Sequence, residues 1–248
     1  MNINLNDIEV ALKEDRIIPV YQAIRDNKTD QVNKYETLAR IRLPDGKLIS
    51  AYKFIEVALQ EVKSSRVYFN ITKTIINKSF NELNDKSCDF SINLSYFDIS
   101  DNETKLFLIA KLKEFPLIGE RLIIEITEGE GANEFWDLKI FMSEMRKYNC
   151  RFALDDFGTG YSNFINLIEL KYDYIKIDGS IIKHIDENIQ SHFIAEMMAK
   201  IASLLSSEVI AEYVHNEKIL EMLSGLQIRY SQGFYIAEPL EYTKLFDI

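Results

Sequence analysis

The sequence of 248 residues has few of the residues that interrupt or cross-link a chain. It contains 4 prolines, 9 glycines and 2 cysteines. Linkers between domains are usually rich in glycine, serine or proline, so this composition favours one domain over residues 1–248. Cys88 and Cys150 each begin an apolar segment, and two cysteines are too few for a disulfide framework. We expect two reduced, buried thiols in a cytoplasmic protein.

Positive charge and long apolar runs are also scarce. The chain has 29 Lys and Arg against 39 Asp and Glu, a net charge of -10, which argues against a basic surface for a nucleic-acid polymer. Its apolar runs fall well short of the roughly 18 residues that a membrane span needs, and its start does not resemble a signal peptide. We therefore expect a cytoplasmic localisation and no membrane contact from this segment. A small anionic ligand remains compatible if metal ions balance its charge.

Short strand-like segments alternate with segments of helical periodicity along the whole chain. The expected strands are centred near Tyr21, Leu38, Ile92, Ile124, Leu154, Ile175, Ile210 and Ile228. The expected helices cover residues 5–14, 52–62, 65–83, 103–114, 134–148, 163–169, 187–206 and 216–223, with a short one from residue 242. About eight strands alternating with helices predict an α/β fold, a single (β/α)8 TIM-barrel-like domain.

Polar or charged side chains stand at the ends of these apolar segments, where they are rarely tolerated without a partner. They are Glu36, Asn93, Glu125, Asp155, Asp156, Lys176 and Glu212. In a (β/α)8 barrel the active site is built at the C-terminal ends of the strands. Closure of the barrel would bring these residues around one mouth, whereas an open sheet would spread them along an edge.

The adjacent pair Asp155 and Asp156 needs a cation, because two neighbouring carboxylates repel each other when buried. The other candidates add only oxygen ligands, and the three histidines show no spacing that would place two of them on one helical turn. Hard oxygen donors suit Mg2+ or Mn2+ better than Zn2+. The oxygen-bearing side chains exceed what one octahedral ion usually takes from protein, so we expect two ions, as in two-metal sites.

Several short motifs follow one another along the chain between Tyr21 and Pro239. They are Glu36-Thr37-Leu38, Asn93-Leu94-Ser95, Glu125-Ile126-Thr127-Glu128, Asp155-Asp156-Phe157-Gly158-Thr159-Gly160-Tyr161-Ser162, Lys176-Ile177-Asp178, Ala211-Glu212 and Gln232-Gly233. Together they resemble the motif series of EAL domains, the phosphodiesterases that hydrolyse cyclic di-GMP to linear pGpG in bacterial second-messenger signalling.

The resemblance implies a role for each matched residue. Glu36, Asn93, Glu125 and Asp155 would bind one metal ion, and Asp155, Asp156 and Glu212 would bind the second. Glu212 would also be the catalytic base, and Lys176 would orient the attacking water or stabilise charge near the phosphate. Gln22, Leu38, Arg40 and Gln232 would contact the substrate.

The resemblance also implies partners. Glu128 would anchor the loop from Asp156 to Asn163, whose movement couples dimerisation to the metal site, so a homodimer is expected. EAL domains are commonly fused to or associated with sensory or GGDEF modules. Residues 1–15 would suit the end of a connecting helix from such an upstream module.

The chain departs from the family pattern at several positions. Thr37 replaces the usual Ala, Ala23 the usual Pro, and Ile41 the usual Trp. Beside the expected base, Tyr213 replaces Gly and His215 replaces Glu. The added bulk and the lost carboxylate are expected to weaken catalysis but to preserve metal binding. The alternative function is therefore a catalytically weak domain that binds cyclic di-GMP as a sensor.

Taken singly, the candidates also fit ordinary structural roles. Glu36 or Glu128 could be a solvated charge at a strand edge, and Asn93 a turn-forming amide. Lys176 could lie on the outward face of an alternating strand, and Arg40 could be a solvated cation at the barrel rim. Their joint occurrence in order favours the site.

Overall fold

The computed structural model describes residues 3–127, 132–158 and 164–245. Its strands form a closed barrel in the order β1-β9-β8-β7-β6-β5-β4-β2, with β1 paired back onto β2 and β3 added at the far half of β2. The strands are β1 (Ile17–Asp26), β2 (Gln31–Arg42), β3 (Leu48–Ser50), β4 (Asp89–Leu94), β5 (Leu122–Thr127), β6 (Arg151–Phe157), β7 (Tyr174–Ile177), β8 (Glu208–Ala211) and β9 (Tyr230–Gln232). The expected barrel is confirmed.

Strand β1 is antiparallel to both of its neighbours, whereas β2, β4, β5, β6, β7, β8 and β9 run parallel to one another. Only a short turn separates β1 from β2, and Asp30 closes it in a left-handed conformation with φ of 60°. A parallel pair needs a crossover of a dozen or more residues, so this short connection permits only a hairpin. The sequence prediction places no helix between the strands near Tyr21 and Leu38, and the structure joins these two strands as a hairpin.

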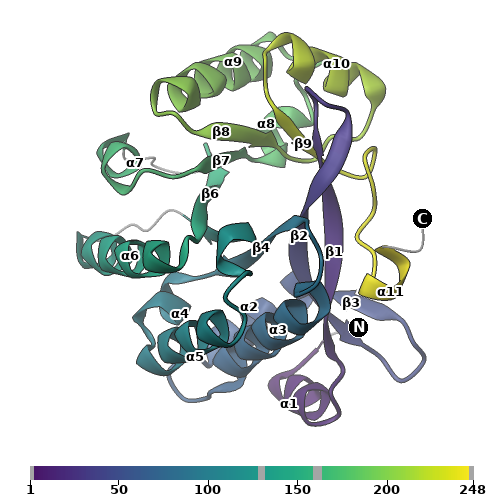
Figure 1. Cartoon of the computed structure of the whole chain (residues 1–248). Helices are drawn as coiled ribbons and strands as arrows, with labels where there is room; N and C mark the ends of the chain where they lie inside the picture. Colours follow the sequence, from purple (N-terminus) through teal and green to yellow (C-terminus); the bar gives the residue numbers. More distant parts are fainter. Residues whose placement is uncertain (1–2, 128–131, 159–163, 246–248) are drawn as a thin grey trace.

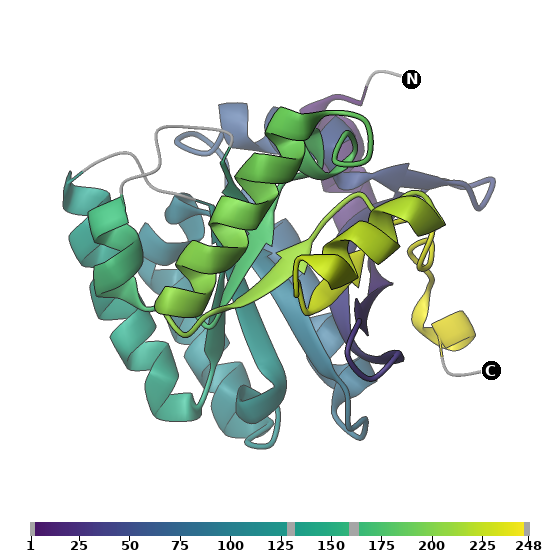
Figure 2. The ribbon, with the colours of Figure 1, turned by 90° about the horizontal axis from the view of Figure 1, so that it is seen from above.

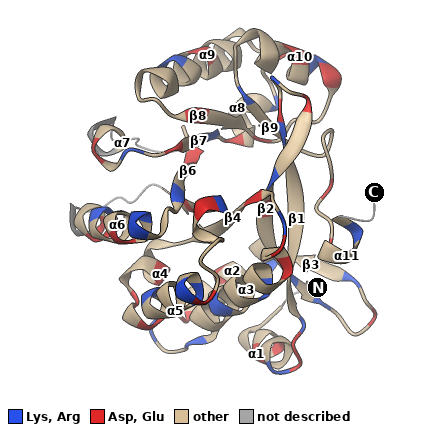
Figure 3. Cartoon of the chain, viewed as in Figure 1, with Lys and Arg blue, Asp and Glu red and all other residues tan. Residues whose placement is uncertain are grey.

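The helices surround the strands (Figures 1 and 2). They are α1 (Leu5–Lys13), α2 (Ile55–Gln60), α3 (Val67–Leu83), α4 (Tyr96–Ser100), α5 (Asn102–Glu114), α6 (Ala132–Met145), α7 (Phe164–Leu170), α8 (Gly179–Ile182), α9 (Ile189–Leu204), α10 (Glu217–Gly225) and α11 (Tyr242–Leu245). None of them, within the described ranges, is both long and apolar enough to cross a membrane. Most charged residues lie on helices and loops outside the barrel (Figure 3).

The sequence patterns miss three short elements, β3, α4 and α8, and place the last strand about three residues too early. Helix α4 has only five residues, too few for a periodic pattern, and depends on a capping box between Ser95 and Asp98. Helix α8 has four residues and begins where the Asp178 side chain accepts a hydrogen bond from the amide of Ser180. Such local capping, rather than periodicity, defines these elements.

The inside of the barrel is built in layers, because every second residue of a strand points to the same face. One buried layer consists of Ile24, Ile123, Ala153, Tyr174, Ile210 and Tyr230. Two residues farther along each strand, counted backwards on the antiparallel β1, stand Gln22, Glu125, Asp155, Lys176, Glu212 and Gln232. The apolar layer therefore forms the floor of a polar layer at the C-terminal ends of the parallel strands.

Below the apolar layer, the opposite end of the barrel is closed by a buried ion-pair network. Lys34 is 4% exposed, and its ammonium lies 2.5 Å from Oδ2 of Asp89. Asp89 also binds Arg151 at 2.7 Å, and Lys34 lies above the rings of Tyr174 and Tyr230. Burial opposes ionisation of Asp89, but Arg151 and Lys34 outweigh it and lower its pKa. This network seals the end of the barrel that carries no site.

Candidate active site

Lys176 lies at the centre of the polar layer and joins four carboxylates from four strands or strand ends. Its Nζ is 2.7 Å from Oε2 of Glu125, 2.8 Å from Oε1 of Glu212, 3.0 Å from Oδ1 of Asp155 and 3.6 Å from Oε2 of Glu36. The side chain is 1% exposed. Burial alone would lower the pKa of Lys176, but the carboxylates, Asp155 foremost, raise it well above its ordinary value. Lys176 is therefore a permanent cation.

Two amide side chains, those of Asn93 and Gln232, donate hydrogen bonds to Glu36. Asn93 Nδ2 donates to Oε1 of Glu36 at 3.0 Å, and Gln232 Nε2 donates to Oε2 at 2.5 Å. Gln232 also donates to Oε1 of Gln22 at 3.2 Å, and Gln22 donates to the carbonyl of Ala237. Burial raises the pKa of Glu36, but Lys176 and the two amides outweigh it and lower the pKa overall. Glu36 is thus kept ionised.

A break in the strand pattern brings Asp155 and Asp156 together. The pairing of β6 with β7 shifts register between Leu154 and Phe157, and Asp156 adopts a left-handed conformation with φ of 56°. In a regular strand consecutive side chains point to opposite faces, so a bulge is needed for both aspartates to face one site. Asp155, Asp156 and Glu212 each offer a carboxylate oxygen, and these three atoms lie within 4.8 Å of one another.

The residues of the layer fit divalent cations. Five carboxylates converge here, and Lys176 forms ion pairs with four of them, Glu36, Glu125, Asp155 and Glu212. Oε1 of Glu125 is buried and accepts no hydrogen bond from the described residues. Excess negative charge and an unpaired carboxylate oxygen are what a hard cation with oxygen ligands would satisfy.

Two of these five carboxylates, Glu125 and Glu212, have raised pKa values. Burial, and then the charge of Glu36, raise the pKa of Glu125 well above its ordinary value. Burial also raises the pKa of Glu212 to about 7, although Lys176 opposes this shift. A carboxylate with a pKa near neutrality is matched to accepting a proton at physiological pH.

Backbone packing fixes the position of Glu212. Its amide donates to the carbonyl of Ile177, which holds the residue at the end of β8. The amide of Val214 donates to the carbonyl of Gln232, and the amide of Tyr235 donates to the carbonyl of Val214. A Cβ on Gly233 would lie 2.2 Å from the Val214 carbonyl oxygen. The close approach of these two segments therefore requires glycine at position 233.

Two cavities flank the carboxylates. One of about 310 Å3 is lined by Gln22, Glu36, Glu212, Gln232 and the aromatic residues Tyr213, His215 and Phe234. The other, of about 560 Å3, is mostly apolar. Leu38, Asn93, Glu125 and Asp156 line its inner end. Arg40 is half-buried, donates to the carbonyl of Ala39 and lies in the electrostatic field of Glu36. A ligand centred on the carboxylates could extend into both cavities.

The two departures beside Glu212 lie at the rim of the smaller cavity. Tyr213 adopts φ of 60°, and His215 is exposed, its ring packed edge-on against Tyr213. His215 Nδ1 lies 3.2 Å from the carbonyl oxygen of Tyr213. Both side chains line the same cavity as Glu212, the expected base.

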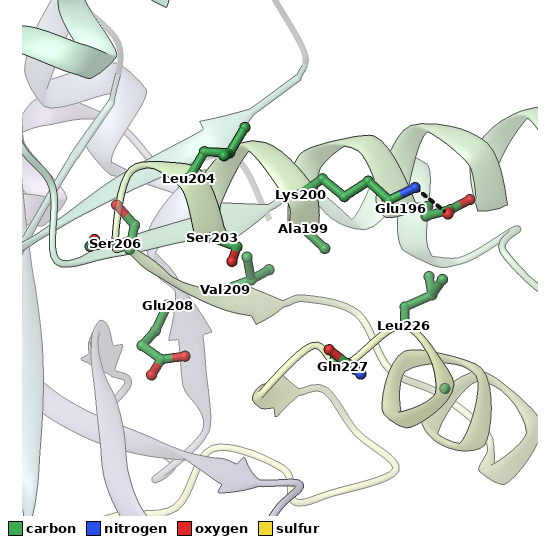
Figure 4. Close-up of a pocket in the computed structure, with 12 residues that line it drawn as sticks. Glu196, Ala199, Lys200, Ser203, Leu204, Ser206, Glu208, Val209, Leu226 and Gln227 are labelled. Atoms are coloured by element: carbon green, nitrogen blue, oxygen red, sulfur yellow. Dashed lines mark hydrogen bonds and ion pairs between the residues drawn. The ribbon is translucent and has the colours of Figure 1, made fainter.

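A larger hollow of about 800 Å3 lies between α9, the start of β8 and the end of α10 (Figure 4). It is lined by residues such as Glu208 and Gln227, and by Lys200, which pairs with Glu196 across one helical turn. Glu208 begins β8, whereas Glu212 follows its last residue, so this hollow and the carboxylate cluster lie at opposite ends of the strand. Among the described residues, the one group of carboxylates close enough to share a metal ion lies at the other end of the strand and not in this hollow.

The structure thus brings together Gln22, Glu36, Asn93, Glu125, Asp155, Asp156, Lys176, Glu212 and Gln232, as the sequence predicts. Leu38 lines the neighbouring cavity, and Arg40 lies close to Glu36 without a hydrogen bond to another candidate. Glu128 and residues 159–163 lie outside the described residues. Phe234 and Gly179, which line the smaller cavity, were not singled out from the sequence, although Phe234 directly follows the Gln232-Gly233 motif.

Comparison with known proteins supplies an independent test. The EAL domain model matches residues 5–239. The cyclic di-GMP phosphodiesterase PdeB of Shewanella oneidensis is 28% identical over 94% of this chain, and the cyclic di-GMP phosphodiesterase PdeF of Escherichia coli is 29% identical over 95%. This chain spans 27% and 31% of those two proteins, so each contains much more than this domain.

The fold also matches that of a solved structure. The PaMucR phosphodiesterase, determined in complex with c-di-GMP, superposes with a TM-score of 0.86 at 22% sequence identity. The match covers 98% of this chain and 99% of that one. The barrel seen here, with its antiparallel first strand, therefore has a close structural counterpart along its whole length.

Proposed function

Because the chain belongs to the EAL domain family, we propose that it hydrolyses cyclic di-GMP to linear pGpG with divalent metal ions. The observation that carries the proposal is the group of five carboxylates at the C-terminal mouth of the barrel, four of which pair with Lys176 while Asp156 lies beside Asp155 and Glu212. The names of the relatives PdeB and PdeF support the choice of cyclic di-GMP as the substrate.

The metal ions in this proposal are Mg2+ or Mn2+. Glu36, Asn93, Glu125 and Asp155 would hold one ion, and Asp155, Asp156 and Glu212 the other; the second set has its oxygens already within 4.8 Å. When bound, the ions would supply positive charge that lowers the pKa of water and neutralises the phosphate oxygens. Lys176 is the resident cation that keeps Glu125 and Asp155 in place.

The chain's own side chains account for the remaining steps. Glu212, with a pKa near neutrality, accepts the proton of the attacking water. Lys176 donates to Glu125 and lies 3.0 Å from Asp155, where its charge would also stabilise the developing negative charge on the phosphoryl oxygens. Gln22 and Gln232 line the smaller cavity, and Leu38 the larger one, where they would contact the two nucleotides. Arg40 would reach a phosphate oxygen through its forked donors.

A second function, binding of cyclic di-GMP as a sensor with weak turnover, is favoured by one observation. Tyr213 and His215 place two rings at the cavity rim beside Glu212, where bulk would compete with productive placement of the phosphodiester. Retention of the full ligand set and of the base favours hydrolysis over this alternative.

We also propose that the chain acts in the cytoplasm as a homodimer, alone or joined to a sensory or GGDEF module. Helices α6 and α7 lie side by side, bridged by Lys139 and Glu169 at 2.5 Å. They expose Trp136, Ile140 and Ile168, each more than half accessible. Dilution through the dimer dissociation constant should lower specific activity if this face assembles, and Ile140→Asp should yield a monomer by sedimentation. A concentration-independent specific activity would refute the coupling.

A direct experiment tests the metal assignment. Asp155→Asn replaces a carboxylate shared by both ion sets with a neutral amide of the same shape. We expect hydrolysis of cyclic di-GMP to be abolished and calorimetry to show weaker Mn2+ binding, while circular dichroism remains unchanged. Full activity of the unmodified protein in excess chelator, or unchanged Mn2+ binding by Asp155→Asn, would contradict the proposal.

A further inference from the structure

Tyr213 adopts a backbone conformation that an aromatic residue rarely accepts. Its φ of 60° lies in the left-handed region, where Cβ crowds the backbone and glycine is favoured. The neighbouring chain makes room for it: a Cβ on Gly179 would lie 2.6 Å from the Tyr213 Cβ and 3.1 Å from its Cγ. Strained conformations persist where the surrounding structure maintains them, and they cluster at ligand sites.

The strain is not repaid by burial of the ring. Tyr213 is 59% exposed, and within the described part of the chain its hydroxyl makes no hydrogen bond. Its only ring partner there is His215, whose centroid lies 5.8 Å away at an interplanar angle of 63°. An edge-on contact leaves a face of the tyrosine ring available, so core packing does not explain the side chain.

The Tyr213 ring belongs to an aromatic rim, which it forms with His215 and Phe234, around the smaller cavity. Phe234, 68% exposed, lies on the segment that follows Gly233, and Gly233 is docked against Val214 directly after Tyr213. The same cavity of about 310 Å3 is lined by Glu36 and Glu212. A planar group that binds in this cavity against Tyr213 therefore lies near the carboxylates that line the same cavity.

We propose that Tyr213 is a substrate-binding residue that stacks on a nucleobase of the substrate while the phosphodiester lies at the metal ions that the carboxylate cluster would hold. This inference rests on the proposed function, because it assumes a nucleotide at the cluster. Stacking of this kind needs a free ring face next to the site that would hold the phosphate, and the exposed Tyr213 ring lines the same cavity as Glu36 and Glu212. The strained backbone of Tyr213 then serves to hold the ring where the base would stack.

The experiment measures binding of cyclic di-GMP by calorimetry in Ca2+, together with KM and kcat in Mn2+. Tyr213→Leu keeps the bulk but removes the ring, and Tyr213→Phe keeps the ring. We expect Tyr213→Leu to raise Kd and KM about tenfold with kcat little changed, and Tyr213→Phe to restore most of the affinity. Phe193→Leu, an equally exposed aromatic on α9, is the matched control and should leave Kd within about twofold.

Tyr213→Gly separates binding from folding. Glycine adopts φ of 60° without strain, so this variant should have an equal or higher Tm and still lose about tenfold in affinity. An unchanged Kd in both Tyr213→Leu and Tyr213→Gly would overturn the inference while leaving the proposed function intact. Failure of the unmodified chain to bind cyclic di-GMP at all would overturn both.

Discussion

The ammonium nitrogen of Lys176 lies 2.8 Å from Oε1 of Glu212, although the two residues come from the ends of different strands. This pair places a permanent cation beside the residue whose pKa is raised to about 7 by burial. The positive charge of Lys176 keeps the pKa of Glu212 from rising further. The pair therefore sets the pH at which the proposed base is ionised.

Replacement of Glu212 tests its role as the base. Glu212→Gln preserves the shape of the side chain but cannot accept a proton, so we expect kcat to fall by about 10^2 to 10^4 while cyclic di-GMP still binds. Glu208→Gln, at the opposite end of β8, removes a partner of Arg229 and should leave kcat within about twofold. Equal effects of the two substitutions in steady-state kinetics would exclude Glu212 as the base.

Removal of the central cation should make stability depend on metal. In the ion-free protein, Lys176→Met leaves four carboxylates without their shared partner, and we expect a loss of about 3 to 5 kcal/mol in urea unfolding. Saturating Mg2+ should recover part of that loss, because a bound ion replaces the missing charge. Lys200→Met, from the exposed pair with Glu196, should cost less than about 1 kcal/mol. A loss for Lys176→Met that Mg2+ does not reduce would contradict this explanation.

Metal affinity should rise with pH and then level off. Without an ion, Glu212 holds a proton below its pKa of about 7, and Glu125, whose pKa is raised well above its ordinary value, also holds one. An ion must displace these protons, so affinity falls as pH drops below about 7 and proton release accompanies binding. Calorimetry in buffers of different ionisation enthalpy measures both quantities. Affinity that is constant from pH 5.5 to 7.5, with no proton release, would show that these carboxyl groups do not bind the ion.

Two glycines provide a matched test of the backbone contact beneath Glu212. Gly233→Ala would force a Cβ to within 2.2 Å of the Val214 carbonyl oxygen, so the two segments must separate. We expect a loss of about 2 to 4 kcal/mol and a sharp fall in kcat. At Gly225, near the end of α10, an added Cβ meets no atom within 4 Å, and Gly225→Ala should be neutral or slightly stabilising. Similar thermal unfolding of the two variants would refute the role given to Gly233.

The sequence predicts the polar layer well because its members share one periodic signal. On the parallel strands each member stands two residues after a residue of the apolar layer, as Glu125 follows Ile123 and Lys176 follows Tyr174, so closure of the barrel places them at one level. The bulge that turns Asp156 toward Asp155 has no such signal, since it depends on a left-handed residue that is not glycine.

Other features depend on contacts between distant segments. Tyr213 is tolerated because Gly179, 34 positions earlier in the numbering, has no side chain there, and no local pattern reveals that contact. The antiparallel β1 follows from the short turn before Gln31, which periodicity alone does not distinguish from a parallel connection. The short elements α4 and α8 depend on capping side chains rather than on a hydrophobic pattern.

The proposed hydrolysis of cyclic di-GMP by this chain is measured most directly by mass spectrometry of the products formed in 18O-labelled water with Mn2+. Hydrolysis predicts linear pGpG carrying one 18O atom in its terminal phosphate, with no product in excess chelator. Tight binding of cyclic di-GMP without any labelled pGpG would contradict the claim and establish the sensor alternative.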